Sequence, residues 1–167
     1  MIEPTRYSRN LNSMKRIALS LTVIVFGSSL LFAQTDQEKK PLRSGEYLGK
    51  LSANPYDPES TSNPFGLYGS PYSPKSVKNP YNRHGFEAQN PYSVNGPRIV
   101  GKGGKYLGRL NRNKYHPESI SNPYGVYGSK YSPYSVRDSF GVYGSRYSPF
   151  SSANPYATEA PKLFGED

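Results

Sequence analysis

The sequence predicts a small, mainly β protein with short helical turns, built as a turn-rich tandem-repeat array with low regular secondary structure. Three observations predict this fold class: a segment that returns after 59 residues, a 16-residue unit inside each copy, and an unusual composition. The 167 residues include 16 tyrosines, 16 prolines and 16 glycines, and no cysteine. A fixed period of this kind is typical of stacked or arrayed repeats, in which each unit contacts its neighbours.

The N-terminal part of the chain is expected to be an export signal. Met14-Lys15-Arg16 is a short positive segment, an apolar run follows it to Ala33, and polar residues come directly afterwards. This order is that of a secretory signal peptide. We expect residues 1–13 to be an upstream extension, residues 14–33 the signal peptide and residues 34–40 a linker. An uncleaved anchor is the alternative, because residues 17–33 are at the short limit for a membrane span.

The remainder of the chain divides into two copies and the beginning of a third. Copy 1 spans residues 41–96 and copy 2 spans residues 97–160. Residues 161–167 repeat only the proline and apolar residues that precede each copy, so they are interpreted as a truncated third copy. The 59-residue offset begins at residues 45–51, which return as residues 104–110, and it continues to Val136.

One β-hairpin is expected in each copy. Residues 106–110 alternate between the two faces of a strand, and the glycine-rich residues 101–104 can turn them back onto residues 98–100. Because of the duplication, residues 47–51 are expected to form the equivalent strand in like surroundings.

The 16-residue unit begins at a tyrosine and has proline two residues later. Its five starts are Tyr56, Tyr72, Tyr115, Tyr131 and Tyr147. Ser73 is suited to cap a helix and Pro74 to be its first residue, so a short helical turn is expected there. Residues 122–125, Asn-Pro-Tyr-Gly, have the preferences of a type I turn. The unit is therefore expected to reverse the chain repeatedly.

The recurrent aromatic residues are the candidate core or, alternatively, the candidate ligand site. Leu, Ile, Val and Phe make up only 20 of the 134 residues from Gln34 onward, which is few for a folded domain. Rings recur at two places in every unit, and Phe and Tyr exchange at the second, which favours packing. We therefore expect these rings to hold the fold, so that Tyr131→Ala is strongly destabilising. If they instead stack on a glycan, the candidates are Tyr56, Tyr72, Tyr115, Tyr124, Tyr131 and Tyr147.

No catalytic, cofactor-binding or metal-binding residue is predicted. His116 occupies a place that holds Asp or Ser in sister units, which is typical of a turn cap and not of a base or ligand. Glu59 and Glu118 have the residue type of the paired acids of a glycosidase. The sister units have Lys, Tyr or Phe at that place, so we expect solvated turn residues instead.

Basic residues stand beside tyrosines at Lys130-Tyr131 and Arg146-Tyr147, a combination used to bind single-stranded nucleic acids. From Gln34 onward there are 17 Lys and Arg against 11 Asp and Glu, spread without clusters, which gives weak attraction to polyanions. Nucleic acid is not expected as a partner because the chain is expected to be exported.

The repeats resemble those of a family of uncharacterised bacterial secreted proteins built from G-x-Y-L-G-x-L and N-P-Y-G-x-Y-G-S-x-Y-S-P motifs. The resemblance covers residues 41–167 and implies export, without an activity. We expect a non-enzymatic structural or interaction protein of the cell envelope or extracellular matrix, located in the periplasm or outside the cell. The alternative is a glycan- or cell-wall-binding module that uses tyrosine stacking. The expected partners are wall or matrix glycans or envelope proteins, with no membrane span after signal cleavage.

The first prediction concerns the mature N-terminus. Cleavage after Ala33 would leave Gln34 as the first residue, because the small Ala33 ends the apolar run and polar residues follow it, although Leu31 is larger than the ideal residue at its place. Mass spectrometry of the protein from the native cell should give this N-terminus. A mature chain that keeps residues 17–33 would contradict the prediction.

Overall fold

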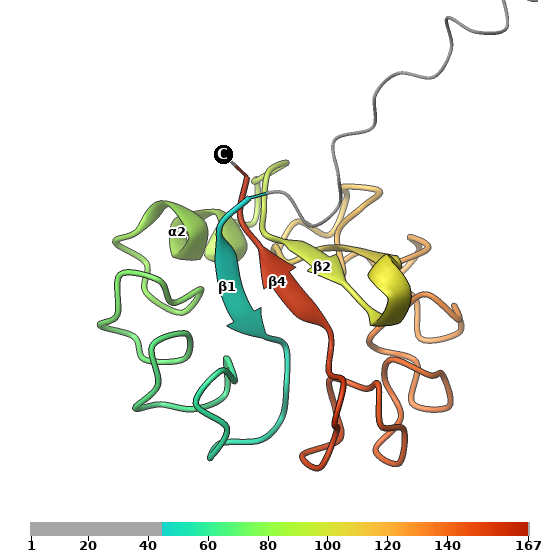
Figure 1. Cartoon of the computed structure of the whole chain (residues 1–167). Helices are drawn as coiled ribbons and strands as arrows, with labels where there is room; N and C mark the ends of the chain where they lie inside the picture. The colour runs from blue at the N-terminus through green and yellow to red at the C-terminus, as the bar shows by residue number, and fades with distance from the viewer. Residues whose placement is uncertain (1–44, 167) are drawn as a thin grey trace, which may run out of the picture. The chain divides into compact units, whose positions relative to one another are not determined.

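The fold is described by a computed structural model for residues 45–166 (Figure 1). The expected signal peptide, upstream extension and linker lie outside the described residues. Helix is scarce, and the regular structure is a small antiparallel sheet. The elements in chain order are β1 (Tyr47–Lys50), α2 (Arg83–Gln89), β2 (Arg98–Val100), the 3-10 helix η1 (Lys102–Gly104), β3 (Tyr106–Arg109) and β4 (Lys162–Phe164).

The sheet has the order β1-β4-β2-β3, and every neighbouring pair is antiparallel. The hairpin expected in copy 2 is confirmed, since β2 pairs with β3. In the described part of copy 1, β1 pairs instead with β4, the strand nearest the C-terminus. Figure 1 shows β4 between β1 and β2, so the last strand joins the two parts of the sheet.

Strands β1 and β3 lie in like surroundings, as the 59-residue offset predicts. Leu51 donates its backbone N–H to the Pro161 carbonyl over 2.7 Å, and Leu110 donates to Pro97 over 2.8 Å. The middle of each strand is a glycine at positive φ, 91° at Gly49 and 92° at Gly108. A Cβ atom at Gly108 would lie 2.6 Å from the Glu118 carbonyl oxygen, so this close approach requires glycine.

The segments after β1 and β3 are successions of hydrogen-bonded turns. Ser76 donates its backbone N–H to Ser73 (3.3 Å), and Asn79 donates to Ser76 (3.2 Å), so a new turn begins at every third residue here. The helical turn expected at Ser73 and Pro74 is therefore a single β-turn. It does not continue as an α-helix, because a helix needs hydrogen bonds between residues four apart at consecutive positions. Here the next hydrogen bond, from the Asn79 N–H to the Ser76 carbonyl, closes a separate turn.

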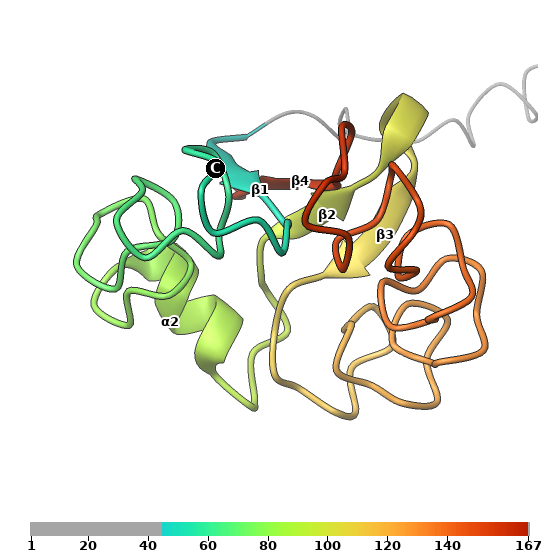
Figure 2. The ribbon, with the colours of Figure 1, turned by 90° about the horizontal axis from the view of Figure 1, so that it is seen from below.

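The repeat does not predict helix α2, because residues 82–86, Asn-Arg-His-Gly-Phe, depart from the repeated unit. Asn82 caps it: its side-chain oxygen accepts from the Gly85 N–H at 2.7 Å. The Phe86 N–H donates to the Asn82 carbonyl at 2.9 Å, and this four-residue spacing continues as a helix where the other units form three-residue turns. Figure 2 shows α2 with the turns after β1 on one side of the molecule, and the turns after β3 on the other.

The core is aliphatic and is centred on the sheet. Its fully buried members are Leu48, Ile99, Leu107 and Leu163, one from each strand, and Val77, Ala88 and Ile120 pack with them. The expectation that the recurrent rings hold the fold is wrong. Those rings are the most exposed large hydrophobic side chains of the described residues. The physical reason lies in the turns: small Ser and Asn residues face inward and leave the rings outside.

The core assignment predicts opposite effects for two substitutions. Leu107→Ala should lower the free energy of unfolding by about 2–5 kcal/mol, because it leaves a cavity in the sheet core. Tyr131→Ala should change it by less than about 0.5 kcal/mol, because the ring is exposed. Thermal or urea unfolding of both variants measures the difference, and a larger loss for Tyr131→Ala would overturn the assignment.

Candidate ligand-binding surface of exposed aromatic rings

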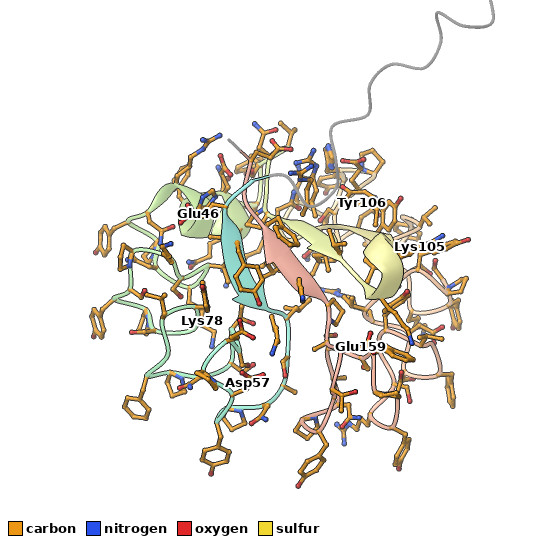
Figure 3. All side chains as sticks on the ribbon, viewed as in Figure 1. Glu46, Asp57, Lys78, Lys105, Tyr106 and Glu159 are labelled. Atoms are coloured by element: carbon orange, nitrogen blue, oxygen red, sulfur yellow. The ribbon has the colours of Figure 1, made fainter. Side chains whose placement is uncertain are left out.

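Eleven aromatic side chains among residues 45–166 are between 80% and 97% exposed. They are Tyr56, Phe65, Tyr72, Tyr81, Tyr92, Tyr115, Tyr124, Tyr131, Phe140, Tyr147 and Tyr156. All six tyrosines predicted as candidate stacking residues are in this set. Figure 3 shows ring-bearing side chains projecting outward from the loops around the rim of the molecule. They project from separate turns along the left, lower and right edges of this view and do not form one flat platform.

Each of these rings follows an Asn, Ser or Asp by two residues, and that side chain holds the backbone of the ring residue. The Asn122 oxygen accepts from the Tyr124 N–H at 3.0 Å, and the Ser129 hydroxyl accepts from the Tyr131 N–H at 3.3 Å. Asp138 does the same for Phe140 at 3.0 Å. These are Asx- and Ser-type turns, which fix the backbone at the ring residue.

The inner side of the turns is small and polar. Five serines that recur in the units are fully buried: Ser60, Ser76, Ser119, Ser135 and Ser151. The asparagine amides reach back across the turns, as when Asn122 donates to the His116 carbonyl at 3.2 Å and Asn154 donates to Ser148 at 2.9 Å. Buried polar groups are tolerated when they are hydrogen-bonded in this way. With the interior filled by short side chains, no room remains there for the rings.

A second set of tyrosines, those flanked by glycine, packs on the sheet. Tyr47 and Tyr68 meet edge to face with centroids 5.4 Å apart, and Tyr106 and Tyr127 do so at 5.2 Å. Burial, followed by the nearby Glu118 carboxylate, raises the pKa of the Tyr106 phenol. Sequence reasoning did not separate these packed rings from the exposed ones. The flanking glycines were the available signal, because they permit close backbone packing beside each ring.

The two glutamates considered as paired acids have structural partners. Glu59 contacts Lys50 at 2.7 Å, and Glu118 contacts Arg109 at 2.7 Å. Burial is the largest cause and acts to raise the pKa of Glu118, but the hydrogen bond and the charge of Arg109, with the hydrogen bond from Tyr106, together hold the pKa below its ordinary value. Arg109 also contacts Glu166 at 2.6 Å. The Glu59 and Glu118 side chains remain 46% and 41% exposed, so the expectation of solvated turn residues holds in part, and their ion pairs also connect turns to strands.

The histidines also lie in structural contacts. His116 accepts the Glu118 backbone N–H at its Nδ1 atom (3.3 Å), as the Asp57 carboxylate does for Glu59 (2.9 Å). The buried His84 has its Nε2 atom 3.3 Å from a Glu46 oxygen. Within residues 45–166, no group of three potential metal-ligating side chains is gathered. Over the same span, no helix has the length and apolar character needed to cross a bilayer.

The net charge differs between residues 45–96 and residues 97–166. Residues 45–96 have four Lys and Arg and four Asp and Glu, whereas residues 97–166 have ten Lys and Arg and four Asp and Glu. The net charges are therefore 0 and +6. Three of the added cations directly precede exposed rings: Lys114, Lys130 and Arg146. The expectation of charge spread without clusters thus does not hold along the chain.

Two hollows are relevant to binding. A cleft of about 570 Å³ lies between the two groups of turns, with Leu51, Leu110 and Val77 among its apolar walls. An open groove of about 580 Å³ lies at Tyr124 and Tyr131, with Lys130 and Arg137 beside the rings. This groove brings together two of the predicted candidate tyrosines and cations, which is the arrangement best suited to hold a ligand.

Comparison with known proteins does not add an identity. No protein-family model, curated protein or solved structure matches this chain. The resemblance to secreted repeat proteins stays a prediction, and function has to be argued from the surface itself.

The Arg109–Glu118 ion pair gives a prediction for the effect of acid. Because folding lowers the pKa of Glu118, the pair stabilises the fold above the ordinary carboxyl pKa of about 4.3, and this contribution is lost as pH falls through the lower folded value. Glu118→Gln should therefore be less stable than the wild type at pH 7, and the difference should shrink below about pH 4. Melting temperatures across pH measure this.

Glu159→Gln is the matched control for that series. Glu159 is exposed, and within residues 45–166 its carboxylate has no ion pair. Its substitution should leave the melting temperature nearly unchanged at every pH. Equal behaviour of the two variants at pH 7 would contradict a stabilising role for the Arg109–Glu118 pair.

Proposed function

We propose that the chain is an exported, non-catalytic binding protein of the cell envelope or extracellular matrix, and that its exposed rings bind a glycan. The observation that carries the proposal is the exposure of eleven rings, each at least 80% accessible and each at a hydrogen-bonded turn. Large apolar side chains exposed in such number are a feature of interaction surfaces. The sequence pattern of an export signal supports an extracellular ligand.

The chemistry of the rings favours sugars. The face of an aromatic ring is electron-rich, so it attracts the weakly positive C–H groups on the apolar face of a pyranose. Phe65 and Phe140 occupy places where other units have tyrosine, so the ring is common to all units and the hydroxyl is not. Stacking on a sugar face needs only the ring. The capped turns also lower the entropy that is lost when a ligand binds, because the backbone of each ring residue is already fixed.

We also propose that the turns form a tandem-repeat array of two copies. Two correspondences between the copies support this organisation. Leu51 and Leu110 make corresponding backbone hydrogen bonds, and the ring pair Tyr47–Tyr68 corresponds to Tyr106–Tyr127. Repetition would give the protein several weak sites for one polymer. Linked weak sites raise the overall affinity because the second contact becomes intramolecular.

A structural role is the second candidate, in which the rings contact envelope proteins or other copies of the chain. The projection of the rings from several separate turns favours it, because rings that point in different directions can contact several partners at once (Figure 3). The two candidates differ in their ligand. A structural element should form oligomers or bind proteins, whereas a glycan binder should be retained on polysaccharide as a monomer.

The test of the proposal removes four rings at once, with Tyr115, Tyr124, Tyr131 and Tyr147 changed to alanine. The variant should fold, because these rings lie outside the core, and its retention on insoluble cell-wall polysaccharide should fall more than about tenfold. The matched control changes the exposed Val126 and Val142 to alanine and should bind like the wild type.

Two results would contradict glycan binding. One is equal retention of the four-ring variant and the control. The other is retention of neither the wild type nor the variant on polysaccharide, together with wild-type oligomers that the four-ring variant no longer forms. That second result would favour the structural role.

A further inference from the structure

We propose that the groove at Tyr124 and Tyr131 is a binding site for a carboxylated sugar unit of an acidic glycan. The inference rests on the proposed glycan-binding function and names the ligand class for one site. The groove encloses about 580 Å³ and is lined by Pro123, Tyr124, Ser129, Lys130, Tyr131 and Arg137. Its volume lies in the range of sites for small organic ligands, about 300–1,000 Å³.

The two rings are presented by a fixed backbone. Asn122 and Ser129 hold the N–H groups of Tyr124 and Tyr131 at 3.0 and 3.3 Å. Between them Ser129 donates its own N–H to the Gly125 carbonyl at 3.0 Å, which closes the turn that separates the rings. The groove is therefore largely preformed, and two ring faces are available to a sugar without refolding of the chain.

The charge of the groove is purely positive. Lys130 and Arg137 are exposed and line it, and no carboxylate does. The Lys130 ammonium is 4.9 Å from the centroid of the Tyr131 ring, so charge and ring are close enough to contact one ligand together. Within the described residues, neither cation has an ion pair. The neighbouring Asp138 uses its Oδ1 atom to accept the Phe140 backbone N–H.

The place 59 residues earlier provides an internal comparison. At that place Phe65 and Tyr72 correspond to the rings Tyr124 and Tyr131. Pro71 and Lys78 correspond to the cations Lys130 and Arg137. The rings are kept, but one cation is replaced by proline. The part of the chain around it also has no net charge, whereas residues 97–166 carry +6. Both places can therefore stack on a sugar, but the groove at Tyr124 and Tyr131 has the additional cation that favours a negatively charged ligand.

A carboxylated sugar satisfies both features of the groove. Its ring can stack on a tyrosine, and its carboxylate can accept charge-assisted hydrogen bonds from Lys130 or the Arg137 guanidinium. Such bonds are stronger than those between neutral groups, so they can select an acidic sugar over a neutral one. A single-stranded nucleic acid would also offer rings and negative charge. The expected export disfavours it, and the experiment below treats it as an opposing outcome.

The test compares Lys130→Pro with the wild type, in the full mature chain. The substitution installs the residue found at Pro71, and the Lys130 backbone N–H donates no hydrogen bond within residues 45–166, so the turn should persist. The probes are oligogalacturonate and the same oligosaccharide with its carboxyl groups methyl-esterified. Calorimetric titration should show about a tenfold loss of affinity for the acidic probe and no change for the ester.

Four further measurements complete the test. Lys130→Gln should reproduce the loss without any change of backbone, and Pro71→Lys should raise the affinity for the acidic probe. Wild-type affinity for that probe should fall as salt is added, because the contacts are exposed. Lys162→Gln, an exposed cation outside the groove, should have no effect.

The possible failures can be told apart. Unchanged acidic-probe affinity in both Lys130 variants, or an equal loss for the ester, would overturn the groove assignment and leave ring-based glycan binding intact. Tighter binding of a single-stranded oligonucleotide of equal charge would overturn the ligand class. If the wild type binds neither oligosaccharide nor polysaccharide, the proposed function itself is wrong.

Discussion

The fold depends on one recurring interaction, the hydrogen bond from a backbone N–H to the side-chain oxygen of the Asn, Ser or Asp two residues earlier. It occurs at Tyr56, Tyr81, Tyr124 and Tyr156, among other ring residues, at 2.9 to 3.0 Å in these four. Each such bond fixes a turn without an extended apolar contact. Repeated along the chain, it replaces the helix and strand hydrogen bonds that most domains of this size use.

The same side-chain-to-backbone hydrogen bonds also determine which side chains are buried. A turn every few residues brings the backbone close to itself, so only short side chains fit between successive turns. Ser76, Ser119 and Ser135 fill that space, and a Cβ atom at Gly128 would lie 2.1 Å from the Asn122 carbonyl oxygen. Aliphatic burial is limited to the sheet and the residues packed on it. The rings are therefore a surface feature produced by the turns, and they are free to contact a ligand.

The sequence predicted the strands well because the 59-residue offset acts on them directly. The hairpin of residues 98–110 and the equivalence of β1 and β3 followed from alternation and glycine placement. The pairing of β1 with β4 is non-local, and no local pattern encodes it. Helix α2 was missed because residues 83–89 depart from the repeated unit, and only the Asn82 cap, which accepts from the Gly85 N–H, marks the start of the helix.

The sequence identified the recurrent tyrosines, but it did not predict whether each side chain faces the interior or the solvent. Periodicity shows that a ring recurs, and it does not show which side of the turn the ring occupies. Tyr127 and Tyr131 lie four residues apart in the chain, yet the first packs on Tyr106 and the second faces solvent. Scarce aliphatic residues suggested that the rings must fill a core. The core is instead a small aliphatic cluster at the sheet, and buried serines and asparagines fill the inner side of the turns, where their hydrogen bonds make polar burial tolerable.

The most direct measurement of this account is hydroxyl-radical footprinting of the folded mature protein, with the oxidation rate of each tyrosine read by mass spectrometry. Tyr124 and Tyr131 should be oxidised nearly as fast as in the denatured chain, while Tyr106 and Tyr127 should be protected. Protection of Tyr124 and Tyr131 equal to that of Tyr106 would place those rings in a core and contradict the account.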